Sequence, residues 1–131
     1  RQVITLTGIA RFQVLEELNS DTPFRLMNVS YDRFDGDCEQ GLGEDEVDRE
    51  KLLAVLRKYL DANRLQGDWT SIVRASSELL INALSVMSPY GPEEKQALLE
   101  AQDLKSRADV LIALAEMEMA SGGGETGGTL Q

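Results

Sequence analysis

The first thirty residues alternate between apolar and polar positions, as half-buried β-strands do. Residues 3–7 are rich in β-branched side chains, and Ile4 and Leu6 alternate with polar neighbours. Gly8 interrupts this pattern and predicts a turn, because glycine adopts backbone conformations that other residues resist. Residues 10–18 predict the next strand. We therefore expect residues 3–7 and 10–18 to form an antiparallel hairpin.

A third strand is predicted in residues 24–31, after a turn at residues 20–23 that contains Ser, Asp, Thr and Pro. Successive side chains of a strand point to opposite faces, so Met27, Val29 and Tyr31 should share one side. With the preceding hairpin, this strand would complete a small antiparallel sheet.

An acidic segment follows at residues 32–50, with Gly36, Gly41 and Gly43 among its Asp and Glu residues. Low hydrophobicity and repeated glycine predict a flexible, solvated connection that ends where a helix begins. The β subdomain and its acidic loop are thus expected to occupy residues 1–45.

The pattern then changes to helical spacing, and we predict helices at residues 47–65, 71–87, 92–101 and 104–120. The last of these repeats apolar residues at helical intervals on a broad stripe and should be buried on two sides. Its stripe consists of Leu104, Ala108, Leu111, Ile112, Ala115 and Met119. Residues 46–120 are predicted to form a helical bundle subdomain, and the Gly-rich tail at residues 121–131 should be disordered.

The predicted fold class is therefore α+β, with N-terminal antiparallel strands followed by a C-terminal bundle of about four helices. A helix start is marked by Gly91, Pro92, Glu93 and Glu94, because proline suits the first helical position and acidic side chains suit the first turn. Asp103 is expected to cap the next helix in the same way.

The net charge of the chain limits the classes of molecule that it can bind. The chain of 131 residues carries a formal net charge of −10, and its 13 Lys and Arg residues are scattered along the sequence. Such a field repels phosphate backbones and anionic lipids, so we expect neither nucleic-acid nor membrane binding. No run of about 18 apolar residues and no signal-peptide pattern is present, which indicates a cytoplasmic protein. Because the chain begins without Met inside a strand-like pattern, we interpret it as a fragment or a processed product.

The residues needed for common catalytic sites are missing from the sequence. The chain contains no His, which excludes Ser-His and Cys-His catalysis, and it has no phosphate-binding P-loop motif. Cys38 is the single cysteine, so an intrachain disulfide is impossible and a structural zinc site would lack ligands. We predict no enzymatic activity, no cofactor and no metal.

One alternative uses the acidic loop at residues 35–46 to bind calcium. Asp35, Asp37 and Glu39 stand at the first, third and fifth positions of a twelve-residue loop that ends at Glu46. Gln40, however, occupies the position where the sharp turn of such a loop requires glycine. A solvated acidic loop is the simpler interpretation, and a calcium-binding interaction module remains the alternative.

Three ordered motifs resemble one family, the N-terminal (substrate-binding) domain of Lon. The stretch "YGPEEKQALLEAQDLKSRADVLIALAE" is similar to the C-terminal end of that domain, and "ITLTGIARFQVLEEL" is similar to its central hairpin. The stretch "GDWT" fits stand-alone bacterial members. The matching positions are Gly8, Arg11, Phe12, Trp69, Glu94, Lys95, Gln96, Leu98, Leu99, Glu100, Asp103 and Arg107.

The resemblance implies a PUA-like pseudo-barrel followed by a helical bundle, and a role in protein quality control through recognition of unfolded polypeptides or protein partners. It implies a structural role for the motif residues and assigns no catalytic residue. The ATPase and protease modules of Lon are not in this sequence, so an accessory part of an ATP-dependent protease is the alternative function. The first strands of the β half are absent from it too, and the resulting exposed β edge could support a homo-oligomer. The side chains expected to meet a partner are Phe24, Met27, Val29, Tyr31, Met87 and Tyr90.

Overall fold

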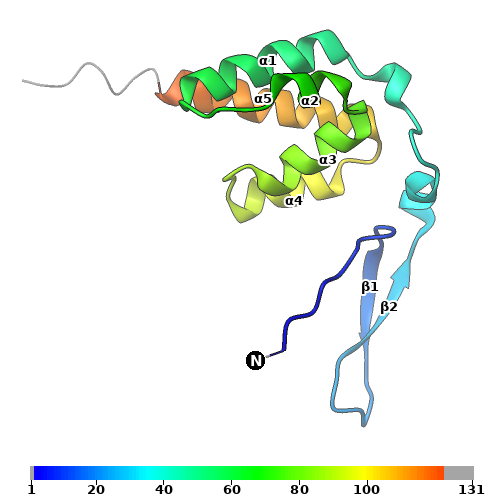
Figure 1. Ribbon diagram of the computed structural model, residues 1–131. Coiled ribbons are helices and arrows are strands. Elements are labelled where there is room, and N and C mark those ends of the chain that lie inside the picture. Colours follow the sequence, from blue (N-terminus) through cyan, green and yellow to red (C-terminus); the bar gives the residue numbers. More distant parts are fainter. Residues whose placement is uncertain (1, 123–131) are drawn as a thin grey trace, which may run out of the picture. The chain divides into compact units, whose positions relative to one another are not determined.

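A computed structural model describes residues 2–122 of the chain and confirms the α+β class (Figure 1). The chain divides into two compact units, Arg1–Leu42 and Gly43–Gln131. We call them the hairpin unit and the helical unit. The division falls slightly before the boundary predicted between residues 45 and 46.

The hairpin unit contains two antiparallel strands, β1 (Gln13–Leu18) and β2 (Leu26–Ser30). In their register Val14 lies opposite Val29, and Glu17 lies opposite Met27. An irregularity between Val14 and Glu16 inserts one extra residue into β1. This bulge keeps Val14 and Glu17 on the same face as Val29 and Met27, because side chains otherwise alternate along a strand.

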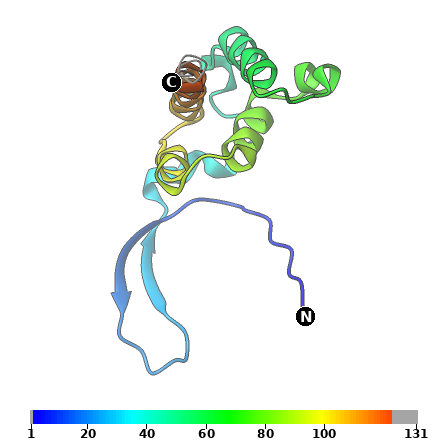
Figure 2. The same cartoon turned by 90° about the vertical axis from the view of Figure 1, so that its left-hand side faces the viewer.

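The predicted pairing of residues 3–7 with 10–18 is wrong. Residues 2–12 form no strand, and the start of this segment runs away from the two strands in both views (Figures 1 and 2). A β-branched segment becomes a strand only where a neighbour completes its ladder of hydrogen bonds, and no strand in residues 2–122 does so. The hairpin turn falls at residues 19–25 instead. There the Ser20 hydroxyl donates to Thr22 Oγ1 at 2.9 Å, and the Thr22 hydroxyl donates to the Phe24 carbonyl at 2.8 Å. The PUA-like pseudo-barrel remains a prediction.

The acidic segment is more ordered than its composition predicts. It forms two 3-10 helices, η1 (Asp32–Cys38) and η2 (Glu44–Glu46), and buries Phe34 to 7% exposure. Gly43 enters η2 with a φ of 79°, a left-handed conformation that favours glycine. The prediction of a flexible connection is therefore wrong for these helical parts.

The helical unit consists of α1 (Arg49–Ala62), α2 (Trp69–Arg74), α3 (Ser77–Met87), α4 (Pro92–Glu100) and α5 (Leu104–Gly122). α5 packs against α1, α3 and α4, which confirms that it is buried on more than one side. Ile81 of α3 and Leu98 of α4 are almost completely buried in this core. The other core residues are Val47, Leu52, Val55, Tyr59, Leu104, Ala108, Leu111, Ile112 and Ala115.

The single helix predicted at residues 71–87 is wrong, because Ala75 and Ser76 are extended and separate α2 from α3. The Arg49 guanidinium donates to the Val73 and Ala75 carbonyls at 2.8 and 2.7 Å and to Ser77 Oγ at 3.0 Å. These bonds satisfy carbonyls that a continuous helix would satisfy with its own N–H groups. The described helical unit accordingly has five α-helices instead of about four.

The helix starts agree with their sequence signals. Gly91 precedes α4, Pro92 begins it, and Glu93 and Glu94 occupy its first turn. Asp103 Oδ1 accepts from the Ser106 N–H at 2.7 Å and so caps α5. At its other end α5 extends to Gly122, so the tail prediction is wrong for residues 121 and 122. The rest of the predicted tail, residues 123–131, lies outside the described residues.

Candidate functional site

The hairpin presents an apolar face built from both strands and the residues beside them. Val14 pairs with Val29 on this face, and Met27 follows at the alternate position of β2. Phe12 and Tyr31 meet just beyond the strands in an edge-to-face contact, with ring centroids 6.1 Å apart and an interplanar angle of 64°. Phe12 and Tyr31 are 51% and 55% exposed. We call these five residues the hairpin face. The register of the strands confirms the prediction that Met27 and Val29 lie on one side of β2.

Phe24 lies at the other end of the hairpin, in the turn, and is 62% exposed. Beside it, the Arg25 guanidinium and the Glu17 carboxylate form a bidentate ion pair with both contacts at 2.8 Å. This pair raises the pKa of Arg25 and lowers the pKa of Glu17. The turn encloses an open hollow of about 380 Å³, lined by residues 17–20 and 22–25. Hydroxyl and ionic contacts therefore hold the turn while its aromatic ring faces solvent.

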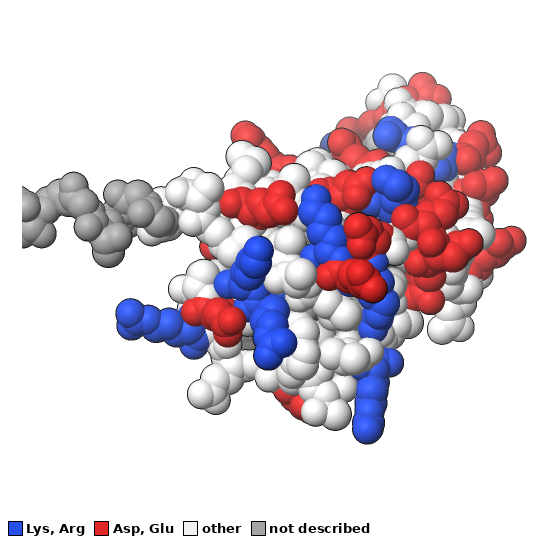
Figure 3. Space-filling model, turned by 90° about the horizontal axis from the view of Figure 1, so that it is seen from above, with Lys and Arg blue, Asp and Glu red and all other residues white. Residues whose placement is uncertain are grey.

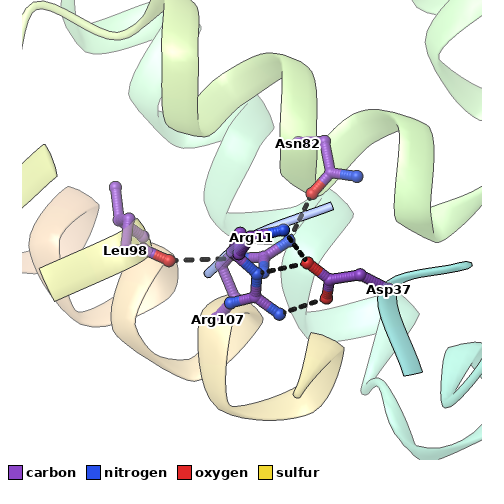
Figure 4. A network of polar contacts seen from close by, with 5 residues as sticks. All are labelled: Arg11, Asp37, Asn82, Leu98 and Arg107. Carbon is purple, nitrogen blue, oxygen red and sulfur yellow. Dashed lines mark hydrogen bonds and ion pairs between the residues drawn. The ribbon is translucent and has the colours of Figure 1, made fainter. Parts of the chain in front are cut away.

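Arg11 anchors the segment before β1 within the hairpin unit (Figure 4). Its Nε donates to Asp37 Oδ2 at 2.8 Å and its Nη2 donates to Asp37 Oδ1 at 2.6 Å. The same guanidinium lies 4.2 Å from the centroid of the buried Phe34 ring. Both charged side chains are shielded, with 15% and 17% exposure for Arg11 and Asp37. Arg11 thus has a structural contact that ties η1 to the start of the hairpin.

The contact between Arg11 and Asp37 argues against calcium binding by the acidic loop at residues 35–46. Asp37, one of its proposed ligands, directs both carboxylate oxygens to Arg11. Within residues 2–122, no group of three or more acidic or cysteine side chains is arranged to hold a metal ion. Cys38 is exposed. The geometry gives no support to a calcium loop at residues 35–46.

A small apolar pocket lies between α1, α3 and α5 of the helical unit. Its volume is about 20 Å³, enough for a single water molecule. Its walls are formed by Leu52, Val55, Leu56, Tyr59, Leu84, Ser88, Tyr90, Leu111, Ile112 and Ala115. Burial raises the pKa of Tyr90 to about 12, with further contributions from Tyr59 and Glu118. Burial and Glu118 also raise the pKa of Tyr59. Both phenols are therefore neutral at physiological pH.

The motif residues of the helical unit lie mainly at helix junctions. Arg107 of α5 donates to Asn82 Oδ1 of α3 at 2.6 Å and to the Leu98 carbonyl of α4 at 3.2 Å, so it joins three helices (Figure 4). Trp69 begins α2, and the Arg57 guanidinium lies 5.1 Å from its ring centroid.

The motif residues of α4 differ in their contacts and in their burial. Lys95 Nζ donates to the Val86 carbonyl at 3.2 Å, and Gln96 donates to Glu100 at 3.0 Å. Leu98 is buried, whereas Leu99 is 53% exposed.

The six side chains predicted to meet a partner come from both units. Phe24, Met27, Val29 and Tyr31 belong to the hairpin unit. Met87 is 80% exposed at the end of α3, whereas Tyr90 is half-buried against the helical core. The sequence reasoning missed two further exposed apolar residues of α3, Leu79 and Val86. Leu79 and Val86 are seven residues apart, which places them on one side of a helix, and this spacing was the signal that could have identified them.

The surface charge agrees with the acidic composition. On the face seen in Figure 3, Lys and Arg side chains lie among Asp and Glu side chains and uncharged surface. Within residues 2–122, no helix is both long enough and apolar enough to cross a membrane.

Comparison with known families assigns the class of the protein. Residues 1–116 match the family described as the ATP-dependent protease La (LON) substrate-binding domain, and the chain belongs to this family. The substrate-binding domain of Lon is a non-catalytic module, and membership of this family supports a substrate-binding role with protein or polypeptide as the ligand. Searches of curated proteins and of solved structures found no significant match.

Proposed function

We propose that the chain is a non-catalytic module that recognises unfolded or client polypeptides through the hairpin face. The exposed apolar surface of the hairpin carries this proposal. Within the described hairpin unit no second layer of structure covers the two strands, and Phe12, Val14 and Tyr31 are each about half exposed. Apolar side chains of an unfolded polypeptide would be removed from water against them, which is the main favourable term in such association.

The hairpin also offers backbone hydrogen bonds. The sheet has two strands, so each has one edge that is unpaired within residues 2–122. An extended client segment can add to such an edge with main-chain bonds that are independent of sequence, while the apolar face selects side chains. Burying the exposed half of one apolar side chain contributes about 1 kcal/mol. A few such contacts, offset by the ordering of the client, support weak and reversible binding.

Binding of a chemically unfolded protein tests the proposal. Fluorescence anisotropy of labelled, reduced and carboxymethylated α-lactalbumin should show saturable binding to the chain. A double variant, Phe12→Ser with Tyr31→Ser, should bind at least about tenfold more weakly because it loses two apolar contacts. The matched control is Gln13→Ser, which alters the opposite face of β1. Equal binding by the double variant and the unchanged chain would refute the hairpin face as the client site.

Delivery of clients to an ATP-dependent protease is the second candidate function, favoured by the description of the family. By itself the chain should not hydrolyse casein with or without ATP, as measured by release of acid-soluble peptides. Client degradation by a Lon-type protease should increase when the chain is added. Casein cleavage by the chain alone would contradict the non-catalytic assignment.

A further inference from the structure

α5 has a second row of small and apolar residues on the side opposite its buried stripe. Its members are spaced four, three and four residues apart, and none of them is charged. The row consists of Ser106, Val110, Ala113 and Met117, and we call these four residues the α5 row. At about 100° of rotation per residue, the α5 row lies about 180° around the helix from the core residues of α5.

The α5 row is open to solvent toward the C-terminal end of the helix. Met117 is 66% exposed and Ala113 is exposed as well, whereas Val110 is partly buried and packs against the edge of the core. Figure 2 shows α5 almost end-on, with its neighbours α1, α3 and α4 gathered to one side. A surface helix normally carries polar residues on its outward side. Packing within the described helical unit therefore does not explain the exposed methionine.

The charged side chains beside the α5 row are paired within the chain. Lys105 Nζ lies 2.6 Å from Asp109 Oδ2, and Lys51 Nζ lies 4.0 Å from Glu116 Oε1. These pairs lie along one flank of the row, and positions 107 and 118 on the other flank are again one basic and one acidic residue. Both flanks are therefore locally neutral, although the chain carries a net charge of −10. This surface favours an uncharged row with balanced flanks over a strongly basic or acidic ligand.

A second copy of the chain supplies such a surface, and the spacing of the α5 row fits it. The row reads the same in both directions, as a two-fold axis perpendicular to the helix requires, because residue i then contacts residue j of the second copy and j contacts i. Aligning Val110 with Ala113 of the second copy also aligns Ser106 with Met117 of the second copy. Each contact sets a larger apolar side chain against a small one, so that the two helices can approach closely.

We propose that the α5 row is a contact between two copies of the chain, with their α5 helices packed antiparallel about a two-fold axis between positions 110 and 113. This contact is separate from client binding at the hairpin face and from the exposed β edge, because it uses the helical unit. The row covers about 17 Å of helix, too little to supply the roughly 800 Å² that each partner contributes to a stable interface. The dimer is therefore weak, with a dissociation constant on the order of 0.1 mM.

Sedimentation equilibrium of the full chain tests the dimer. The unchanged chain should pass from monomer to dimer between about 10 µM and about 1 mM. Long-range repulsion between two chains of net charge −10 opposes the contact, and salt screens this repulsion. Raising sodium chloride from 50 to 500 mM should therefore strengthen dimerisation several-fold. A chain that stays monomeric over this whole range of concentration at 500 mM salt would overturn the proposal.

Substitutions locate the contact. Ala113→Glu should weaken dimerisation at least about tenfold with unchanged circular dichroism, because it places a carboxylate against Val110 of the second copy. The matched control is Leu79→Glu, which adds the same charge at a position of α3 that is 60% exposed. It should dimerise as the unchanged chain does. A dimer that Ala113→Glu leaves intact would overturn the proposal, and its loss in the hairpin variant Phe12→Ser with Tyr31→Ser would place the contact at the hairpin instead.

Cysteine cross-linking tests the antiparallel register. In a Cys38→Ser background, the variants Ser106→Cys and Met117→Cys are mixed, oxidised and analysed by mass spectrometry. The mixture should give a disulfide-linked heterodimer. Each variant alone should cross-link poorly, because identical positions are about 17 Å apart along the helices of an antiparallel pair. Efficient cross-linking of Met117→Cys with itself would show a parallel pair and contradict the proposed contact.

Discussion

Replacing Arg49 by alanine should be among the most destabilising surface substitutions in the helical unit. The Arg49 guanidinium donates to the Val73 and Ala75 carbonyls at 2.8 and 2.7 Å and to Ser77 Oγ at 3.0 Å. A hydrogen bond from a charged donor contributes about 1.5 to 3 kcal/mol. The bond to Val73 is exposed, and water can replace it at little cost. We therefore expect the two part-buried bonds, to Ala75 and Ser77, to dominate. Together they would contribute about 3 to 6 kcal/mol if fully shielded, and their partial exposure to water lowers the expected loss in the free energy of unfolding to about 2 to 4 kcal/mol.

Urea unfolding followed by circular dichroism at 222 nm measures this loss. The midpoint should fall while the dependence on urea concentration stays the same, because the folded surface changes little. Arg49→Lys is the informative intermediate, since a lysine ammonium keeps the charge but lacks the planar fork that reaches several acceptors. Arg57→Ala is the matched control. It removes an arginine that stacks on Trp69 at 5.1 Å, worth about 0.5 to 1 kcal/mol at an exposed site.

The reasoning fails if Arg49→Ala unfolds at the same urea concentration as the unchanged chain. That result would mean that the bend between α2 and α3 is stable without the guanidinium. A second informative result would be a continuous helix through Ala75 in the variant, seen as increased helical signal before unfolding. The bend would then be imposed by Arg49 and not by the local sequence.

The remaining predictions concern the contact between Arg11 and Asp37, the backbone conformation of Gly43 and the ionisation of Tyr90. Arg11→Ala should lower hydrogen-exchange protection in η1, because it removes a bidentate bond to Asp37 whose two side chains are 15% and 17% exposed; unchanged protection would show that η1 does not depend on Arg11. Gly43→Ala should cost about 1 kcal/mol in urea unfolding, because an alanine is strained at a φ of 79°. Gly8→Ala, where an added Cβ meets nothing within 4 Å, should cost much less, and equal costs would contradict the conformational explanation. Tyr90 has a pKa raised to about 12 from 10.0, so its contribution to stability is complete below pH 10 and is lost as the pH rises through about 12. Tyr90→Phe should remove the last phase of the absorbance titration at 295 nm, and an unchanged titration would show that Tyr90 ionises normally.

Local signals in the sequence predicted most of the helical unit. The start of α4 depends on Gly91, Pro92 and the two glutamates that follow, all within one turn. The buried stripe of α5 follows from the spacing of its own residues, and Leu111 and Ile112 are 4% exposed as that spacing requires. Such features are visible in one sequence because the residues that determine them are neighbours in the chain.

Features that depend on distant residues were predicted poorly. Residues 3–7 have the composition of a strand, but pairing depends on a neighbour, and the chain instead pairs β1 with β2. At the break between α2 and α3, the Ala75 carbonyl accepts from Arg49, which lies 26 residues earlier in the chain. The buried Phe34 ring in the acidic segment lies 4.2 Å from the guanidinium of Arg11, a distant residue in the sequence. Composition and periodicity carry no information about these contacts.

Binding at the hairpin face should not weaken when salt is added, and this tests its physical basis. The hairpin face binds through apolar side chains and main-chain bonds, which ionic strength affects little. Attraction between a cationic client and a chain of net charge −10 would instead be screened over a distance of about 10 Å at 0.1 M salt. Raising sodium chloride from 50 to 500 mM should therefore not weaken binding of unfolded α-lactalbumin. A several-fold loss of affinity at high salt would mean that electrostatic attraction, and not the apolar face, holds the client.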